Sequence, residues 1–197
     1  MLPDECRPPA PPYAGEGPHA MWHFSEDPAI EVFRPQRVRE GPSVELEPRV
    51  WAVDTRHAPT FWFPRDCPRG CAWWSERTTP EDRADFFRHS LADRIHVIEQ
   101  GWLPAVQRCE LFAYRLPHES FEPHEVGGYW TTTETVEPLE RIVVGDLVAR
   151  HAEAGIELRI TPSIWTWWAD IVPTTLEFSG SRLRNCGAPM PDSLAQL

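Results

Sequence analysis

The stretch MWHFSEDP, residues 21–28, determines the predicted fold more than any other part of this chain. Its first half is a short apolar run that predicts a β-strand, and its second half is an acidic turn that ends the strand. Because alternate residues of a strand face the same way, His23 and Ser25 should point together into the space that this strand borders. An imidazole and a hydroxyl placed in this way could both hydrogen-bond a polar ligand.

A second interpretation of the same stretch needs no ligand. His23 can be a core histidine whose ring nitrogens are satisfied by the backbone, and Ser25 or Asp27 can cap the turn at residues 28–30. Both interpretations are open at this point.

Length and composition predict one main domain. The chain has 197 residues, 41% of them hydrophobic, and 10 Trp, enough to bury a sizeable core. We expect a disordered Pro-rich tail over 1–20, a single α+β domain over 21–187 and a C-terminal tail over 188–197. Neither a run of about 20 apolar residues nor a signal peptide is present, so we expect a cytoplasmic protein with no membrane partner.

The charged residues restrict the possible partners. All 19 basic residues are Arg, and 30 acidic residues bring the net charge to -11. Extended nucleic-acid binding normally needs a basic face and is therefore not expected. A local group of Arg could still hold one phosphorylated small molecule, because the guanidinium fork suits phosphate. The five Cys are odd in number and scattered, which does not indicate a disulfide framework. The sequence gives no oligomeric state.

Short apolar or alternating segments bounded by turn residues predict most of the secondary structure. Strands are expected near residues 21–24, 50–53, 70–74, 94–98, 109–116, 129–133, 156–160 and 174–178. Helices are expected from Thr79 to about His89, over 144–154 with an end at Gly155, and as one or two turns over 165–171. Strands and helices do not alternate regularly, so we predict an α+β fold with a mainly antiparallel, curved sheet.

Aromatic residues follow the second predicted strand. The segment 51–63 indicates a strand carrying Trp51, an acidic turn, and a short helix carrying Phe61 and Trp62. Their rings could stack on a nicotinamide or a base at the edge of a pocket. The alternative is that they are core residues.

Two Arg pairs could bind an anion. Arg65 and Arg69 lie in a loop rich in Pro and could clamp a pyrophosphate. Arg182 and Arg184 follow a Ser-Gly-Ser sequence whose backbone amides could cradle the same kind of group. Ordinary salt bridges and a solvated edge strand are the alternatives.

A zinc site is a weaker hypothesis. His57, Cys67 and Cys71 have an acceptable spacing, but no second pair of ligands lies nearby in the sequence. No metal is therefore expected.

Four blocks are similar to those of a family of uncharacterised bacterial proteins. They read HFSEDP from residue 23, VWAVD from 50, WFPRDCPR from 62 and FSGSRLRN from 178. The similarity extends over about residues 21–186.

The order of elements more distantly resembles the ADP-ribosyltransferase-like fold, a split sheet that binds NAD. In that fold a first strand carries a His and, two residues later, a Ser or Thr, which His23 and Ser25 match. A later strand supplies a Glu that stabilises the charge formed as nicotinamide leaves. Within residues 127–134 the acid is Glu134. The resemblance therefore implies His23 and Glu134 as catalytic residues.

The same resemblance implies further ligand contacts. Trp51 takes the place of an aromatic on the second strand, and Phe61 or Trp62 would stack on nicotinamide. The resemblance implies an enzyme that uses NAD, either transferring its ADP-ribosyl group or cleaving it. The alternative is a nucleotide-binding or regulatory module without turnover, and in both cases the partner is a small-molecule nucleotide.

Overall fold

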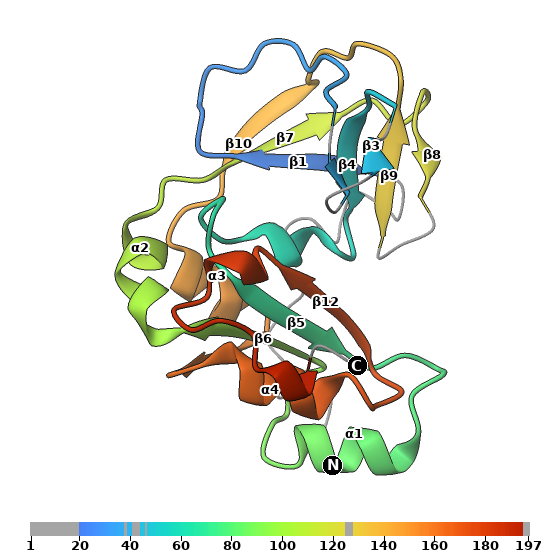
Figure 1. The fold of residues 1–197 in the computed structure, drawn as a ribbon. Coiled ribbons are helices and arrows are strands. Elements are labelled where there is room, and N and C mark those ends of the chain that lie inside the picture. The colour runs from blue at the N-terminus through green and yellow to red at the C-terminus, as the bar shows by residue number, and fades with distance from the viewer. Residues whose placement is uncertain (1–19, 38, 41–43, 46, 125–127, 195–197) are drawn as a thin grey trace. The chain divides into compact units, whose positions relative to one another are not determined.

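The computed structural model describes residues 20–37, 39–40, 44–45, 47–124 and 128–194. Its fold is α+β, with a mainly antiparallel sheet and a second, mixed sheet (Figure 1), so the predicted fold class is confirmed. The chain divides into two compact units. Among the described residues, 63–109 and 146–194 form the four-strand unit, and 20–62 together with 110–145 form the six-strand unit. A single domain over 21–187 stays a prediction. The Pro-rich tail expected over 1–20 lies, up to residue 19, outside the described part of the chain.

The six-strand unit contains an antiparallel sheet with the strand order β10-β7-β1-β4-β9-β8. The bounds are β1 Met21–Ser25, β4 Val50–Asp54, β7 Phe112–Leu116, β8 Glu122–Pro123, β9 Tyr129–Thr132 and β10 Glu140–Val143. A separate hairpin joins β2 Arg39–Glu40 to β3 Val44–Glu45. The core of the unit includes Met21, Phe33, Val50 and Tyr114.

Strands β1 and β4 separate soon after they meet. β1 pairs with β7 along its whole length, from Met21 to Ser25. With β4 it pairs only at Met21↔Asp54 and Trp22↔Val53. Figure 1 shows β1 lying across the direction of β4 and β9. From residue 23 onward, therefore, the edge of β1 that faces β4 is not paired with that strand.

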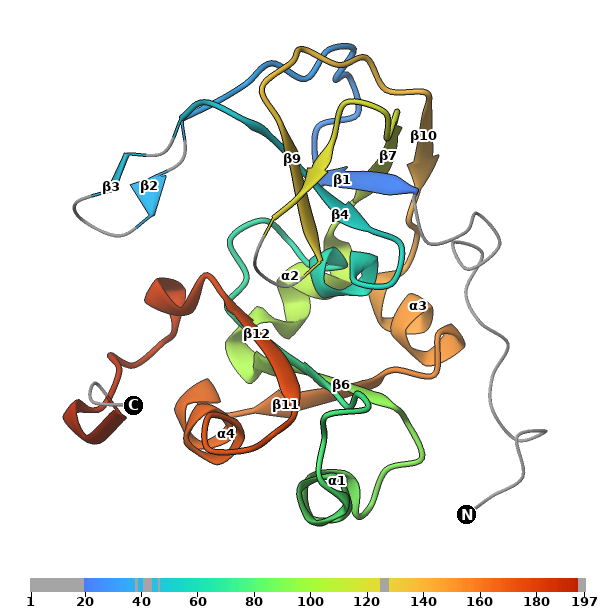
Figure 2. The ribbon, with the colours of Figure 1, turned by 90° about the vertical axis from the view of Figure 1, so that its right-hand side faces the viewer.

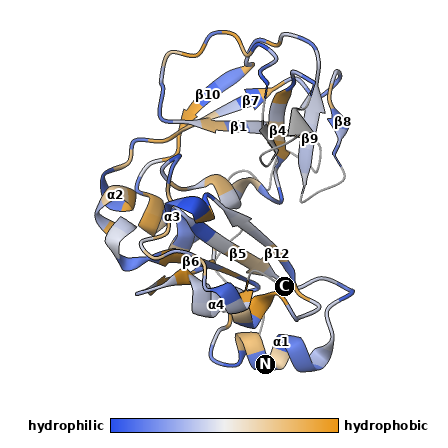
Figure 3. Cartoon of the chain, in the orientation of Figure 1, coloured by the Kyte–Doolittle hydropathy of each residue, from blue (hydrophilic) through white to orange (hydrophobic). Residues whose placement is uncertain are grey.

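The edge strand β10 is exposed. Its four residues are all solvent-accessible, and Figure 3 shows it changing from hydrophilic at its start to hydrophobic at its end. Ile142 exposes 38% and Val143 60% of their surface. The strand was not predicted from the sequence.

The four-strand unit has the strand order β11-β6-β5-β12 (Figure 2). Its strands are β5 Arg69–Trp73, β6 Arg94–Glu99, β11 Glu157–Thr161 and β12 Glu177–Ser181. β6 and β11 are parallel, whereas the other pairs are antiparallel. Its α-helices are α1 Pro80–Phe87, α2 Leu103–Arg108, α3 Leu147–Glu153 and α4 Ile164–Ile171.

Local sequence signals explain where two predicted helices begin and end. Thr79 accepts a hydrogen bond from the backbone of Asp82 at 3.2 Å, and Pro80 takes the first helical position of α1, as expected. Gly155, at φ +68°, follows the end of α3 in the left-handed conformation that a glycine adopts readily.

Two predicted strands begin later than expected. The helix α2 ends at Arg108, and β7 starts at Phe112 rather than at 109. β12 starts at Glu177 because the preceding Thr174 and Thr175 form a turn. The Thr174 hydroxyl donates to the carbonyl of Ile171 at 2.8 Å, and the Thr175 amide donates to Asp82 at 2.7 Å.

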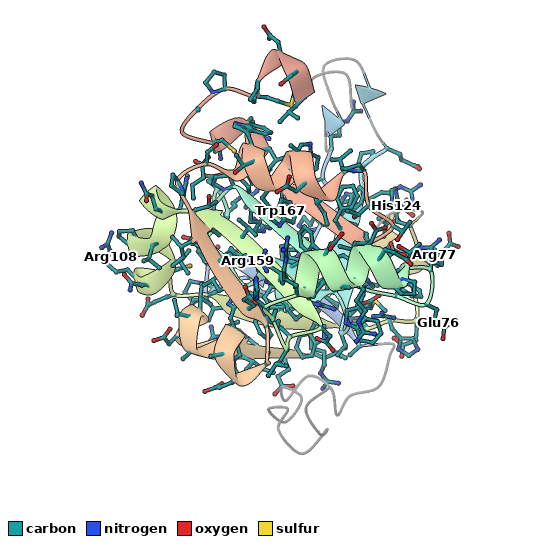
Figure 4. The ribbon with its side chains drawn as sticks, turned by 90° about the horizontal axis from the view of Figure 1, so that it is seen from below. Glu76, Arg77, Arg108, His124, Arg159 and Trp167 are labelled. Atoms are coloured by element: carbon teal, nitrogen blue, oxygen red, sulfur yellow. The ribbon has the colours of Figure 1, made fainter. Side chains whose placement is uncertain are left out.

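Helix α4 closes the core of the four-strand unit. Its apolar residues Ile164 and Ile171 are fully buried against the sheet. The indole of Trp167, labelled in Figure 4, lies so close to Gly70 that a Cβ on that glycine would stand 2.1 Å from the ring. The chain beyond β12 also contacts this core, because Trp165 donates its indole N–H to the carbonyl of Ala188 at 2.8 Å. No helix in the described part of the chain has the length and apolar character needed to cross a bilayer.

Candidate functional site

His23 lies where β1 leaves β4. Its Nδ1 is 2.9 Å from the carbonyl oxygen of Trp51, and its half-buried ring lies 4.7 Å from that of Phe33. Since a carbonyl can only accept, Nδ1 is the protonated nitrogen, and in the neutral ring Nε2 is then an acceptor. The imidazole thus connects β1 to β4 at residue 23, the first residue of β1 that no longer pairs with β4. Its orientation is set by the backbone of β4.

Ser25 lies on the same face of β1 as His23, as predicted. Its hydroxyl oxygen accepts a hydrogen bond from the amide of Asp27 at 3.1 Å. The Asp27 carboxylate in turn accepts from the amide of Ala29 at 2.8 Å. Both side chains therefore cap the turn that follows β1, which is the local role considered for them from the sequence.

Five half-buried rings form a chain of contacts in the six-strand unit, which we call the aromatic cluster. Its members are Phe24, Trp51, Phe61, His124 and Tyr129. Phe24 and Phe61 are nearly parallel, with centroids 6.2 Å apart, whereas Tyr129 meets both Phe61 and Trp51 edge-on at 5.7 and 5.9 Å. His124, labelled in Figure 4, lies 4.9 Å from Trp51. The structure thus brings together the predicted residues Trp51 and Phe61.

Phe61 and Trp62 differ sharply in exposure. Phe61 ends a short 3₁₀ helix, Ala58–Phe61, which confirms the short aromatic helix expected after the second strand. Phe61 is half-buried, but Trp62 exposes only 3% of its surface. Of the two residues predicted to stack on a ligand, Phe61 is the one with an accessible surface.

Glu134 lies beyond the end of β9, which stops at Thr132. Its side chain is exposed, and its amide donates to the Thr132 hydroxyl at 3.1 Å. The carboxylate is therefore carried by the segment after the strand and not by the strand itself.

The four predicted Arg belong to the four-strand unit. Arg182 donates from Nε to the carbonyl of Arg65 at 3.1 Å, and Asn185 donates to the carbonyl of Asp66 at 2.7 Å. The blocks WFPRDCPR and FSGSRLRN therefore contact each other although they are more than 100 residues apart. The backbone of Arg182 has φ +57°, a conformation uncommon outside glycine.

Arg69 and Arg184 have opposite environments. Arg69 exposes 5% of its surface, donates to the carbonyl of Cys67 at 3.1 Å and places its guanidinium 5.5 Å from the ring of Phe63. Arg184 is exposed. The structure brings Arg65 and Arg182 together, whereas the guanidinium of Arg69 points into the interior of the unit.

Asp54 and His57 form a pair that the sequence analysis did not single out. The carboxylate oxygen Oδ1 of Asp54 lies 2.7 Å from Nδ1 of His57 and 2.8 Å from its backbone nitrogen. Burial, the largest influence, acts to raise the pKa of Asp54, but hydrogen bonds and the charge of His57 outweigh it and hold the pKa below its usual value. The Asp-x-x-His spacing at a strand end was the available signal.

A second histidine pair lies in the interior of the four-strand unit. His96 and His151 are both 0% exposed, with Nδ1 of His96 2.9 Å from Nε2 of His151. Burial lowers the pKa of His151 to about 4 and the pKa of His96 well below its usual value. Both rings are therefore neutral at pH 7.

The proposed zinc ligands are divided between the two units. His57 belongs to the six-strand unit, whereas Cys67 and Cys71 belong to the four-strand unit and are buried, which raises the pKa of each thiol to about 12. Among the residues with described positions, no three His, Cys, Asp or Glu side chains gather so as to hold a metal ion.

Comparison with known proteins identifies the family. A model described as a family of unknown function, DUF6886, matches residues 22–186. Because this match covers most of the chain, the protein belongs to the DUF6886 family, and the predicted extent of the family similarity is confirmed. No curated protein and no solved structure matched the chain.

Proposed function

We propose that the chain binds NAD or a related nucleotide in the six-strand unit and breaks the bond between nicotinamide and ribose. The observation that carries the proposal is the early separation of β1 from β4, with His23 at the point of separation. It agrees with the sequence resemblance to the split sheet of the ADP-ribosyltransferase-like fold. The description of the DUF6886 family names no activity, so the proposal does not rest on family membership.

The first support comes from His23. In the ring with Nδ1 bonded to the Trp51 carbonyl, Nε2 can accept a hydrogen bond from a ribose hydroxyl. The ring is only half-buried, and its contact with the Trp51 carbonyl fixes its orientation. Ser25, on the same face of β1, is the second group proposed to contact the ligand.

The second support comes from the aromatic cluster. Its rings are half-buried, and Tyr129 meets Phe61 and Trp51 edge-on, so the cluster offers aromatic surface that is not fully enclosed. Phe61 follows the strand that carries Trp51 and is the proposed stacking residue for nicotinamide or adenine. Base stacking on an aromatic side chain is typically worth about 1–3 kcal/mol.

Binding without turnover is the second candidate function, and the position of Glu134 favours it. A carboxylate on the segment after β9 is less constrained than one within a paired strand. Electrostatic stabilisation of a transition state depends on groups fixed in advance. The proposal concerns the six-strand unit, and Arg65, Arg69, Arg182 and Arg184 stay predictions for phosphate binding.

Binding is tested by titration calorimetry with NAD and with ADP-ribose. Phe61→Ala should weaken binding by about 5- to 150-fold, the equivalent of about 1–3 kcal/mol. Phe86→Ala is the matched control, because Phe86 is a half-buried ring of the four-strand unit that packs against Phe87. Absence of binding to either compound, or equal losses in the two variants, would contradict the proposal.

Turnover is tested by chromatographic measurement of nicotinamide released from NAD. If Glu134 is the catalytic carboxylate, Glu134→Gln should slow release by at least about 100-fold, because such a group acts on the transition state. Glu137→Gln is the control, since Glu137 is another exposed acid three residues further along the chain. Equal rates in the two variants would remove Glu134 from the reaction.

A further inference from the structure

We infer that His57, held by Asp54, is the proton acceptor of this site. The inference rests on the proposed function and adds to it the group that activates the attacking water. The sequence assigned neither residue a role in nucleotide binding. His57 was considered only as a possible zinc ligand.

The two hydrogen bonds between Asp54 and His57 serve different purposes. The bond from the His57 amide to Asp54 closes the turn after β4 and could form with any residue except proline at position 57. The bond from the ring at 2.7 Å is not needed for that turn. Because a carboxylate only accepts, it holds the proton on Nδ1 and leaves Nε2 as the acceptor nitrogen, the same relation that orients the histidine of a serine protease triad.

Further contacts fix the position of the ring. The imidazole lies against Gly128, where a Cβ would stand 2.0 Å from Nδ1, and the φ of that glycine is +74°. The carbonyl of His57 accepts from both the amide and the hydroxyl of Thr60, at 3.0 and 2.7 Å. The His57 side chain nevertheless retains 17% exposure. It is thus held in place and still in contact with solvent.

The dyad lies next to the aromatic cluster. His57 immediately precedes the 3₁₀ helix that Phe61 ends. His57 packs on Gly128, and Phe61 packs on the next residue, Tyr129. One short segment therefore places both the dyad and the proposed stacking ring against one end of β9.

The chemistry that this arrangement would carry is hydrolysis of a nucleoside bond. The bond between ribose C1′ and the nicotinamide nitrogen breaks, and its electron pair stays with nicotinamide, which leaves as a neutral molecule. Water forms the new bond to C1′ and gives its proton to Nε2 of His57. The Asp54 carboxylate stabilises the resulting imidazolium, which then releases the proton to solvent. The products are ADP-ribose, nicotinamide and one proton.

The test compares His57→Gln and Asp54→Asn in the full-length protein, with NAD affinity and the kcat of nicotinamide release as the readouts. Both variants should bind NAD within about twofold of the wild type and lose about 10²- to 10⁴-fold in kcat. Asp146→Asn is the matched control. The Asp146 carboxylate accepts two backbone hydrogen bonds at the start of α3, so it serves as a cap in the other unit.

Each result separates the two ideas. Loss of kcat with unchanged affinity in both dyad variants, and neither in the control, supports the inference. A kcat within a few-fold of the wild type, or a wild-type protein that binds NAD without releasing nicotinamide, overturns it. Failure of the wild type to bind NAD overturns the proposed function itself. If His57→Gln does not fold, Asp54→Asn decides, because it preserves the side-chain shape and the acceptor for the turn.

Discussion

The buried pair of His96 and His151 should make the protein less stable in mild acid. His151 donates from Nδ1 to the carbonyl of Leu147 at 2.6 Å, so its Nε2 must accept from Nδ1 of His96. The other nitrogen of His96, Nε2, has no hydrogen-bond partner among the described residues. A proton added to His151 would place two N–H groups against each other in a site that water does not reach.

The size of the effect follows from the pKa of His151. It is about 4 in the folded protein against 6.5 for an ordinary histidine, so the unfolded chain takes up the proton first. The free energy of unfolding is therefore highest above pH 6.5 and falls as the pH drops from there toward about 4. For this residue alone the loss is about 2 kcal/mol between pH 7 and pH 5 and about 3 kcal/mol by pH 4. His96 shifts in the same direction and adds to the loss.

Urea unfolding followed by tryptophan fluorescence at pH 7, 6 and 5 measures this dependence. His151→Asn keeps a donor toward the Leu147 carbonyl but cannot titrate, so it should be less stable at pH 7 and lose less stability between pH 7 and pH 5. His89→Asn, at an exposed histidine, should match the wild type. A wild-type stability that does not change over this range, or an unchanged slope in His151→Asn, would refute the reasoning.

Three further predictions concern the four-strand unit. Gly70→Ala should destabilise the protein by about 1–3 kcal/mol, because the added methyl group overlaps the buried indole of Trp167. Gly101→Ala is the control, since no atom lies within 4 Å of the added carbon, and thermal melts compare the two variants. Thr79→Ala should cost about 1 kcal/mol through loss of the cap of α1, and Thr79→Ser should restore most of it, as measured by urea unfolding. Cys67 and Cys71 should react with iodoacetamide at pH 8 only after unfolding, because burial raises the pKa of each thiol to about 12; rapid labelling in the native protein, detected by peptide mass spectrometry, would show that the thiols are accessible.

Local patterns predicted most of the strands and helices but not which strands pair with each other. The Thr79-Pro80 pair and Gly155 marked helix ends because caps act over a few residues. The edge strand β10 and the short helix α2 were missed, since neither has strong local signals. The parallel pairing of β6 with β11 joins segments about 60 residues apart, and a sequence pattern does not specify such a choice.

For the candidate site, the sequence predicted the face of β1 that carries two of the residues but not how deeply the other residues are buried. The alternation along β1 correctly placed His23 and Ser25 on one face. Composition could not separate Phe61 from its neighbour Trp62, although only the second is almost fully buried. The burial of Arg69 could not be foreseen either, because a charged side chain at a strand start is normally exposed.

The way the chain passes between its two units has a consequence for its synthesis. Within the described residues it crosses after Trp62, Cys109 and Gly145. The ribosome therefore delivers the last strand of the six-strand unit, β10, while the four-strand unit still lacks α3, β11, α4 and β12. Residues 63–109, with their apolar strands β5 and β6, must wait for about 70 further residues before their sheet can close. During that interval the apolar side chains of these two strands lack the neighbouring strands and helix that bury them, and transiently exposed apolar surface of this kind promotes aggregation.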